Sequence, residues 1–470
     1  MRSQAHTPGR RFLAQSAGLL VAFLTAHLAP AATAERHPAR SPEEALKLFQ
    51  LEAGLRIELV AAEPLVINPV AFVFDGPRRL FVAEGRGYPD PVEGSGQTTA
   101  GRIALLEDRD GDGRFERRSE FAADLGYVNG LALWRGGIFV TAAPDILYLK
   151  DTDGDGVADQ REIVLTGFDA TKTAQLRVSH PTLGLDGKIY VTSGLNGGKV
   201  TSPAHTGRAA VTFSLKDGRF DPDTYAFENT SGRGQFGLTF DAFGRRFFCS
   251  NRHPVMQIML EPAHLARNPH LSFSESVQEV SKVQAEAAVF PISRASITAD
   301  FIPSLMAAPH AGTFTSASGV FIFGGTGLTP EHQGNVFICE SAQNLVQRQV
   351  LRPEGAAFRS DPPAAGKEFL ASTDVWFRPV FLGEGPDGAL YLADMYRREI
   401  DHPSYVPEES RGKLDFVSGK DRGRIYRIVR ENAPVRAKPP GTTTPELVRS
   451  LDAPEGWWRE LAQRLLVERA

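Results

Sequence analysis

The chain has 470 residues, of which 42% are hydrophobic and 23% are charged, as in ordinary soluble globular proteins. Its 56 acidic and 52 basic residues give a formal net charge of −4, which excludes the general electrostatic attraction on which nucleic-acid-binding proteins depend. The 45 glycines and 32 prolines are typical of a chain with many short strands joined by turns.

The N-terminal residues have the pattern of a secretory signal. Arg10 and Arg11 precede an apolar run from Ala17 to Leu28, and Ala32–Ala34 offers a cleavage site between small residues. We therefore predict a signal peptide over residues 1–34, cleaved near Ala34, and a periplasmic or secreted mature protein. The apolar run is too short for a comfortable membrane span, and no later stretch is long and apolar enough, so we expect no transmembrane span in the mature chain.

A short helix is expected next, because Ser41 is a good N-cap and is followed by proline and two acids; we predict that this helix runs through Leu51. A pattern of apolar strand, glycine-containing turn and second apolar strand then recurs six times. The six segments are residues 68–86, 129–151, 179–198, 236–252, 318–341 and 378–397.

The spacing of these segments indicates a repeat architecture. Their matching apolar residues are 52, 55, 82 and 60 positions apart from the second segment onward. Units of this size with several strands each are typical of a β-propeller, in which each sheet buries both faces against its neighbours. We predict an all-β fold, a six-bladed β-propeller over residues 41–430, with a long surface loop or insertion at 264–290.

The C-terminal part differs in composition. A proline-rich stretch predicts a linker over residues 431–445, and "PEGWWRELAQRLLVERA" predicts an amphipathic helix. We interpret residues 446–470 as a helical stub, the start of a HEAT-like repeat that is not continued in this sequence.

Two hairpin loops carry alternating acids. "DTDGDGVADQRE" has the spacing of an EF-hand loop, in which carboxylates surround a hard cation. We predict a structural Ca²⁺ held by Asp151, Asp153, Asp155, Asp159 and Glu162. A second, weaker loop contains Asp108, Asp110 and Asp112. The alternative is an ordinary Asp-Gly turn.

The two cysteines lie in strand-like runs. Cys249 and Cys339 are 90 residues apart, and the sequence leaves open whether they pair, although two buried thiols are the simpler interpretation. No Cys-x-x-Cys-His is present, so a covalent haem site is not expected in this chain.

Polar residues beside the innermost strands are the candidates for a site, because propellers place ligands at one end of the central channel. The candidates are Glu84, Arg86, His180, Arg233, Asn251, Arg252, His253, Glu340, Gln343, Asn344, Arg378, Asp394, Tyr396 and Arg397.

At these positions the chain resembles the soluble quinoprotein sugar dehydrogenases, which are glucose/sorbosone dehydrogenase-like six-bladed propellers. "SHPTLGLDGKIYVTSG" is similar to their segment NH-x-x-G-x-L-x-(F/I)GPDG-x-(I/L)Y, and "GRGQFGLTFD" and "FRPVFLGEGPDGALYLAD" are similar to later segments. The resemblance implies that His180 is the general base and that Arg233 lies beside pyrroloquinoline quinone (PQQ). It further implies that Arg252, His253, Gln343, Arg378 and Arg397 surround this cofactor. The family asparagine after the arginine is Gly234 here, and the family lysine in the fifth blade is not matched.

The chain also resembles a membrane-bound dehydrogenase family of Planctomycetes and Verrucomicrobia. The segments that carry this resemblance are "VAEGRGYPD", "HQGNVFICESAQNLV", "ADMYRREIDHP" and "GWWRELAQRLLVER". Members combine a propeller with helical repeats and often a cytochrome c domain. Because this chain lacks a haem module, the resemblance implies a separate cytochrome c-type electron acceptor.

The leading interpretation is a PQQ-dependent dehydrogenase that oxidises a sugar or an alcohol. One alternative is a non-catalytic propeller that binds a carbohydrate or a protein. Another is a metal-dependent, lactonase-like hydrolase whose ion would be held by Glu84, Asn129, Asn251 and Asp394. Fold alone does not choose among them.

Overall fold

The computed structural model describes residues 37–89, 99–268, 270, 276–295, 297, 300, 302, 310–432 and 441–470, within the compact unit Glu35–Ala470. The signal peptide predicted for residues 1–34 and most of the predicted linker lie outside the described residues. No helix in the described ranges is long and apolar enough to span a membrane.

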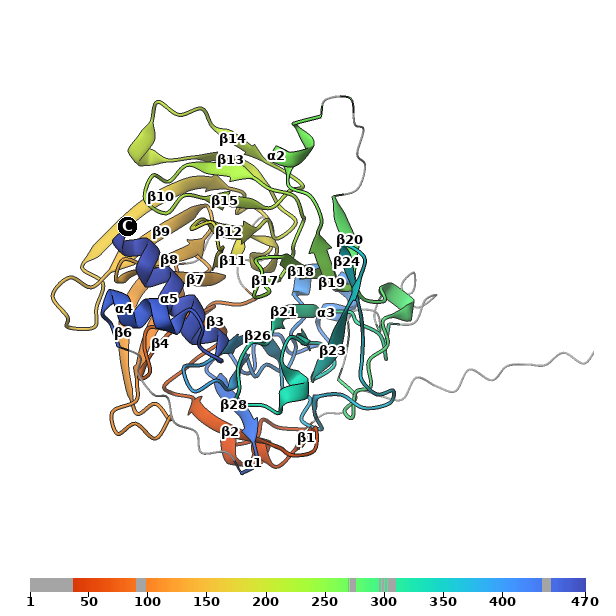
Figure 1. Ribbon diagram of the computed structural model, residues 1–470. Coiled ribbons are helices and arrows are strands. Elements are labelled where there is room, and N and C mark those ends of the chain that lie inside the picture. Colours follow the sequence, from red (N-terminus) through yellow and green to blue (C-terminus); the bar gives the residue numbers. More distant parts are fainter. Residues whose placement is uncertain are drawn as a thin grey trace, which may run out of the picture. The chain divides into compact units, whose positions relative to one another are not determined.

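Six antiparallel sheets follow one another around a ring (Figure 1), so the prediction of a six-bladed β-propeller is confirmed. Blade 1 contains β3 (Pro69–Phe74), β4 (Arg79–Glu84), β5 (Gly101–Glu107) and β6 (Arg117–Leu125). Blade 2 contains β7 (Gly130–Trp134), β8 (Gly137–Ala142), β9 (Asp145–Lys150) and β10 (Gln160–Phe168), extended by β13 (Gly198–Thr201) and β14 (Val211–Phe213). Blade 3 contains β11 (Ser179–Leu183), β12 (Ile189–Thr192), β15 (Gly218–Phe220) and β16 (Phe227–Asn229).

The second half of the ring is built in the same way. Blade 4 contains β17 (Gly237–Phe240), β18 (Arg246–Ser250), β19 (His253–Ile258) and β20 (Val277–Glu279). Blade 5 contains β21 (Ala317–Ile322), β22 (Val336–Glu340), β23 (Leu345–Glu354), β24 (Ala357–Asp361), β25 (Leu370–Ser372) and the N-terminal β1 (Phe49–Leu51). Blade 6 contains β26 (Pro379–Glu384), β27 (Leu390–Asp394), β28 (Arg424–Arg430) and the N-terminal β2 (Leu55–Ala62). The predicted insertion at 264–290 thus supplies β20, the outermost strand of blade 4.

The helices are few and short. They are α1 (Pro42–Leu46), α2 (Pro262–Leu265), α3 (Glu408–Arg411), α4 (Thr444–Ser450) and α5 (Gly456–Arg469), with 3₁₀ turns at Ala174–Leu176, Pro203–His205, Gln284–Glu286, Pro330–His332 and Pro403–Tyr405. Ser41 caps α1 through a capping box with Glu44, as its sequence predicts. The expected extension of this helix to Leu51 is wrong, because Phe49–Leu51 pairs with Leu370–Ser372 as an edge strand.

Each repeated sequence segment contains the two innermost strands of one blade, and the segment 129–151 also includes β9. Asp186 and Gly187 make the turn between β11 and β12, where Gly187 has a φ of 76°. The Tyr190 hydroxyl donates to Asp186 at 2.9 Å, and Tyr391 donates to Asp387 at 2.9 Å in the equivalent turn of blade 6. The Asp-Gly pair with a tyrosine four residues after the aspartate therefore builds the same hairpin twice.

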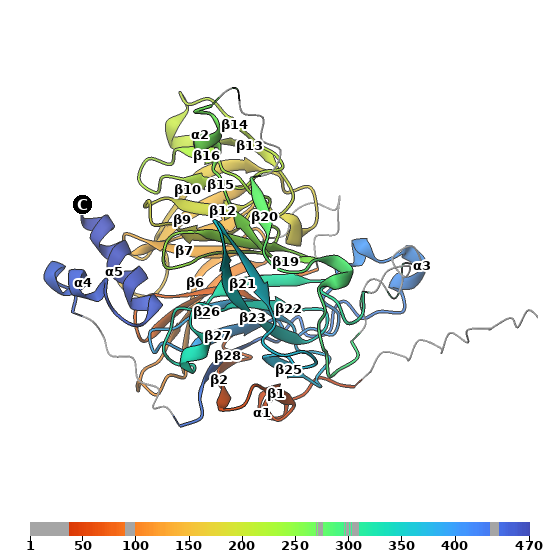
Figure 2. The ribbon, with the colours of Figure 1, turned by 45° about the vertical axis from the view of Figure 1, so that its right-hand side comes forward.

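The six innermost strands surround the axis, and each contacts the innermost strand of the next blade. We call the face where these strands begin the start face and the opposite face, where they end, the end face. The segment with α3 lies on the start face, and α4 and α5 lie on the end face (Figure 2).

Candidate functional site

A cavity of about 860 Å³ follows the axis of the ring and opens on the end face. All six innermost strands contribute to its wall, together with residues of α5. Its wall is mainly apolar and includes Phe72, Leu131, Leu183, Phe240, Val320, Phe321, Phe381 and Leu382. Ligand pockets typically enclose about 300–1,000 Å³ with apolar walls and a few polar groups, and this cavity has that character.

Irregular backbone brings two residues of the wall close to the axis. Gly319 has a φ of 53°, and a Cβ atom at this position would lie 2.9 Å from the Phe381 Cα, so blades 5 and 6 approach closely only because residue 319 is glycine. His180 also has a positive φ, 51°, where the register of β11 and β12 shifts between Ser179 and Thr182. This bulge turns the His180 side chain toward the channel.

His180 is half-buried at the inner end of the cavity. Its ring stacks on Phe381 with the centroids 5.6 Å apart, and its Nδ1 lies 3.2 Å from the Ser179 hydroxyl. Burial lowers the pKa of His180 to about 4, so the ring is neutral at physiological pH. The buried Nε2 has no hydrogen-bond partner among the described residues. The sequence therefore locates a channel-lining imidazole correctly, while its catalytic role stays a prediction.

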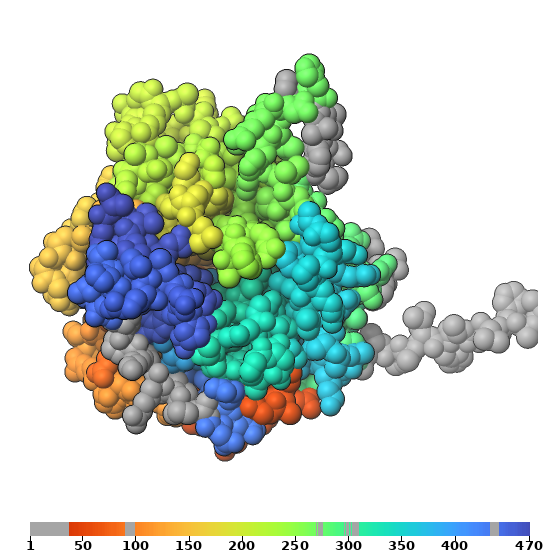
Figure 3. Space-filling model, in the orientation of Figure 1, coloured from red at the N-terminus to blue at the C-terminus, as the bar shows by residue number. Residues whose placement is uncertain are grey.

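Helix α5 lies beside the mouth of the cavity, and the C-terminal residues cover part of the end face (Figure 3). Trp457 and Trp458 are buried with Phe72, Phe74 and Tyr391 in the core between blades 6 and 1. The Trp457 backbone N–H donates to Glu384 Oε1 at 2.9 Å at one end of the helix.

Further along the helix, the side-chain amide of Gln463 donates to the Leu185 carbonyl at 3.2 Å, beyond the end of β11. Helix α5 thus joins blade 6 to blade 3.

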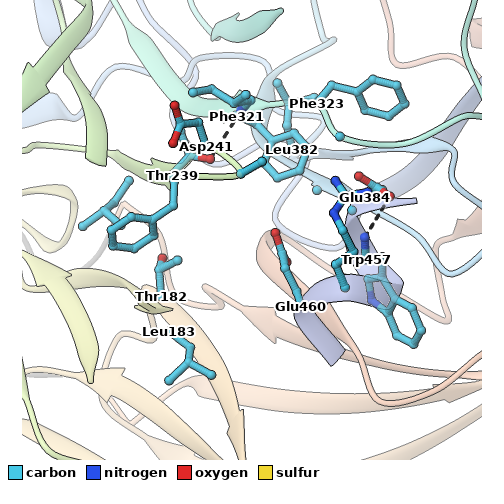
Figure 4. A pocket seen from close by; sticks show the side chains of 18 of the residues that line it. Thr182, Leu183, Thr239, Asp241, Phe321, Phe323, Leu382, Glu384, Trp457 and Glu460 are labelled. Carbon is cyan, nitrogen blue, oxygen red and sulfur yellow. Dashed lines mark hydrogen bonds between the residues drawn. The ribbon is translucent and has the colours of Figure 1, made fainter. Parts of the chain in front are cut away.

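Two carboxyl groups lie at this mouth (Figure 4). Glu384 ends β26 and is 9% exposed, and burial raises its pKa to about 8. Glu460 of α5 points between the side chains of the wall and is exposed to solvent. Neither residue was a candidate from the sequence, because their proximity depends on how α5 docks against the ring.

The channel is filled toward the start face. Tyr88, Tyr127, Ala174 and Met395 form a buried cluster there, packed against the partly buried Val70, Val380 and Ile400. The Tyr88 hydroxyl donates to the Ile400 carbonyl at 2.5 Å and lies 2.8 Å from the Gln175 side-chain oxygen. These bonds tie together three loops that converge on the axis.

Arg378 and Arg397 are buried behind these loops. The guanidinium of Arg378 donates to the carbonyls of Ser341, Ala342, Arg397 and Arg398. Arg397 donates to the carbonyls of Tyr88 and Phe416 and to the Asn68 side chain. Both arginines are at most 1% exposed, so each guanidinium serves to hold the backbone of the start face.

The other residues expected around a cofactor lie apart. Arg233 is exposed before β17 and does not line the axial cavity that contains His180. Gln343 is buried and bonds the backbone at Gly312 and Thr313. Arg252 lies 3.0 Å from His310, and the half-buried His253 lies 2.7 Å from Glu279, which raises its pKa.

These residues do not fit PQQ at the start face. Arg378, Arg397 and Gln343 direct their polar atoms to backbone groups of the protein, and aromatic side chains occupy the adjoining channel. His180 lies beyond the cluster of Tyr88, Tyr127, Ala174 and Met395, in the cavity that opens on the end face. The family segment quoted above has a longer spacing between its histidine and the Asp-Gly turn, and the shorter spacing here puts His180 within strand β11 itself.

The residues of the hydrolase alternative also serve the scaffold. Glu84 is buried in a two-bonded ion pair with Arg118 and accepts the Ile67 N–H. Asn129 donates to two backbone carbonyls, and Asp394 accepts two backbone N–H groups. The half-buried Asn251 follows β18. In the part of the chain that the structure describes, Glu84 and Asp394 belong to no group of acidic, histidine or cysteine side chains close enough to share a metal ion.

The acidic loops gather their carboxylates as a hard cation requires. Asp151, Asp153 and Asp155 place oxygens within 4.8 Å of one another. Asp159 instead accepts bonds from Thr152, and Glu162 accepts the Tyr225 hydroxyl. In the other loop Glu116, which the sequence pattern did not single out, joins Asp108, Asp110 and Asp112. The donor chemistry of both loops fits Ca²⁺.

Both cysteines are buried free thiols, and burial raises the pKa of Cys249 to about 12.

Fold and cavity together define a six-bladed β-propeller with a cavity along its axis. The family model described as "Domain of unknown function (DUF7133)" matches residues 41–432, so the chain belongs to this family. The comparisons do not support the membrane-bound dehydrogenase family. A search of curated proteins finds no match.

Solved structures with similar folds include proteins described as sugar dehydrogenases and one described as a gluconolactonase. An oxidoreductase (glucose dehydrogenase) from Thermus thermophilus is 16% identical over 80% of this chain and 100% of its own, with a TM-score of 0.42. The PQQ domain of pyranose dehydrogenase from Coprinopsis cinerea is 12% identical over 85% of this chain and 99% of its own, with a TM-score of 0.43. A protein described as a gluconolactonase is 12% identical over 84% of this chain and 97% of its own, with a TM-score of 0.40.

Proposed function

We propose that this chain binds a small molecule in its axial cavity, which the ligand enters from the end face beside α5. The observation that carries this proposal is the cavity itself, about 860 Å³ in volume and lined by all six blades. A packed protein interior rarely leaves voids larger than a water molecule, so a space of this size is a feature to be explained.

The inner end of the cavity offers one directional contact. His180 Nε2 is buried and lacks a partner, and a ligand hydroxyl or amide that reached it would remove an unsatisfied polar atom. A histidine with a pKa of about 4 is a weak general base at neutral pH, so we assign His180 to ligand recognition.

The test is a cavity-filling substitution. Thr182 lines the cavity from β11 and is half-buried, so Thr182→Trp places an indole in the space that the ligand would occupy. Compounds selected by thermal shift against the wild type should lose their stabilising effect on this variant and keep it on Arg233→Ala, which changes the exposed start face. Unchanged binding to the Thr182→Trp variant would overturn the proposal.

Oxidation of a sugar or an alcohol is the second candidate, and it is supported by the resemblance of the repeated segments to quinoprotein dehydrogenases. The misfit at the start face weighs against it. Protein incubated with PQQ and Ca²⁺ should therefore neither take up the quinone spectrum nor reduce an artificial acceptor with sugars or alcohols. Turnover that is lost in Arg378→Ala, with the thermal stability of that variant unchanged, would restore the dehydrogenase interpretation.

The periplasmic location and the cytochrome c partner stay predictions. The cytochrome c partner belongs to the oxidation candidate alone, whereas the periplasmic location is compatible with both candidates.

A further inference from the structure

Glu460 is an acid on the inward face of a helix. It lies three residues after Trp457 and four before Arg464, and both of these side chains are buried. Residues three and four apart share one face of a helix, so the same docking that buries Trp457 directs Glu460 toward the ring. Figure 4 shows its carboxylate reaching into the space between the wall residues.

The charged neighbours of Glu460 have other hydrogen-bond partners, although the charge of Arg459 also favours the ionised form of Glu460. The Arg459 guanidinium donates to the carbonyls of Ala453 and Pro454, and Arg464 pairs with Glu468 at 2.8 Å. Arg245, across the cavity, pairs with Asp241 in its own hairpin. Among the charged side chains that line the described cavity, Glu460 alone has no hydrogen-bond or ion-pair partner within the described residues.

The second carboxyl group at the mouth, Glu384, is mainly protonated at neutral pH, so the negative charge there belongs to Glu460. Oε1 of Glu384 accepts the Trp457 N–H. The pKa of Glu384 is raised mainly by burial, and the negative charge of Glu460 raises it further. An anionic ligand would meet the carboxylate of Glu460, and a sugar would leave most of the apolar wall in contact with polar hydroxyls. The aromatic and aliphatic wall favours a hydrocarbon or aromatic body instead.

We propose that the axial cavity binds an organic cation, an amine carried on an apolar body, with its ammonium group on Glu460 and its body between Phe321, Phe381 and Leu382. This inference rests on the proposed function, because it takes the axial cavity as the ligand site. An ammonium group supplies the charge-assisted hydrogen bonds that Glu460 lacks. Nearby aromatic faces further favour a cation over a neutral group.

Three probes of similar size test which ligand charge the cavity prefers: cationic 2-phenylethylamine, neutral 2-phenylethanol and anionic phenylacetate. Titration calorimetry on the full chain should give the amine an affinity about tenfold or more above the alcohol, as expected for a hydrogen bond to a charged group, with phenylacetate weakest. Glu460→Gln should bring the amine to the level of the alcohol. Asp452→Asn, which removes the same charge from an exposed residue of the turn between α4 and α5, should leave the preference for the amine intact.

The outcomes separate the two proposals. Equal binding of amine and alcohol, or a preference for the amine that survives Glu460→Gln, would overturn the proposal that the ligand is a cation held by Glu460. The cavity would remain the binding site if Thr182→Trp still abolishes binding. Failure of all three probes to bind at millimolar concentration would count against both proposals. Folding of each variant is checked by its circular dichroism spectrum.

Discussion

Glu384 shows how a single buried acid couples the ring to its C-terminal helix. Its Oε1 accepts the Trp457 N–H, and its pKa of about 8 means that the protonated, uncharged form predominates at neutral pH. In the unfolded chain the same group ionises near its ordinary value of 4.5. Because the folded pKa is raised, its contribution to stability is complete below about pH 4.5 and is lost as the pH rises through 8.

We predict that Glu384→Gln stabilises the protein at alkaline pH. The amide keeps the acceptor for Trp457 and never ionises, so the variant should gain up to ~3 kcal/mol over the wild type at pH 9 and little at pH 5. Urea unfolding at a series of pH values measures the difference. Asp452→Asn should follow the wild type at every pH, and parallel curves for Glu384→Gln and the wild type would contradict the prediction.

The residues of the start face illustrate which side-chain roles a sequence can and cannot reveal. The sequence placed His180, Arg378, Asp394 and Arg397 correctly beside the innermost strands, because strand positions follow from the hairpin pattern. It could not tell whether a guanidinium there meets a ligand or a carbonyl group. That depends on the loop that carries Phe416, 19 residues after Arg397, whose carbonyl accepts a hydrogen bond from Arg397.

The sequence also could not reveal the role of the acidic candidates beside the strands. Glu84, Glu340 and Asp394 end the second strand of their blades and accept backbone N–H groups that lead into the innermost strand. Burial raises the pKa of Glu340 and Asp394 to about 7. These carboxylates hold two strands of one blade together by accepting backbone N–H groups. Only the three-dimensional structure distinguishes this structural role from a role in holding a metal ion or a bound molecule.

At the scale of elements, the two acidic hairpins connect the outer strands of blades 1 and 2, β5 to β6 and β9 to β10. In each loop the first aspartate accepts two glycine N–H groups, and the following aspartates each accept one backbone N–H. Their remaining oxygens converge, as a hard cation requires. In the first loop, Arg78 and Arg427 donate to the backbone carbonyls of Arg109, Asp112 and Gly113.

We predict that Ca²⁺ raises the melting temperature by about 2 °C relative to the chelated protein, since an ion that binds only the folded state stabilises it. Asp153→Asn and Asp110→Asn should each reduce the rise, and the double variant should abolish it. Glu162→Gln serves as the control, because Glu162 bonds Tyr225 outside the cluster. The prediction fails if EGTA leaves the melting temperature of the wild type unchanged.

At the scale of the whole molecule, six blades followed from the sequence because each blade repeats its own hairpin of two innermost strands. The sequence did not predict the two N-terminal strands that complete blades 5 and 6. These strands, β1 and β2, pair with β25 and β28, which lie more than 300 residues away. A short edge strand carries no periodic signal, so Phe49–Leu51 was predicted as the continuation of a helix. Which end of the channel stays open was equally hidden, because long-range docking of α5 and of the Pro403–Tyr405 segment decides it.

The pairing of β2 with β28 also determines when β2 can fold during protein synthesis. Leu55 cannot meet Arg430 until nearly the whole ring has left the ribosome, so β2 emerges early and waits with an unpaired edge. Contacts this distant in sequence form slowly. During that interval the exposed edge is a target for aggregation, and the nascent protein would benefit from a holding chaperone until the last blade arrives.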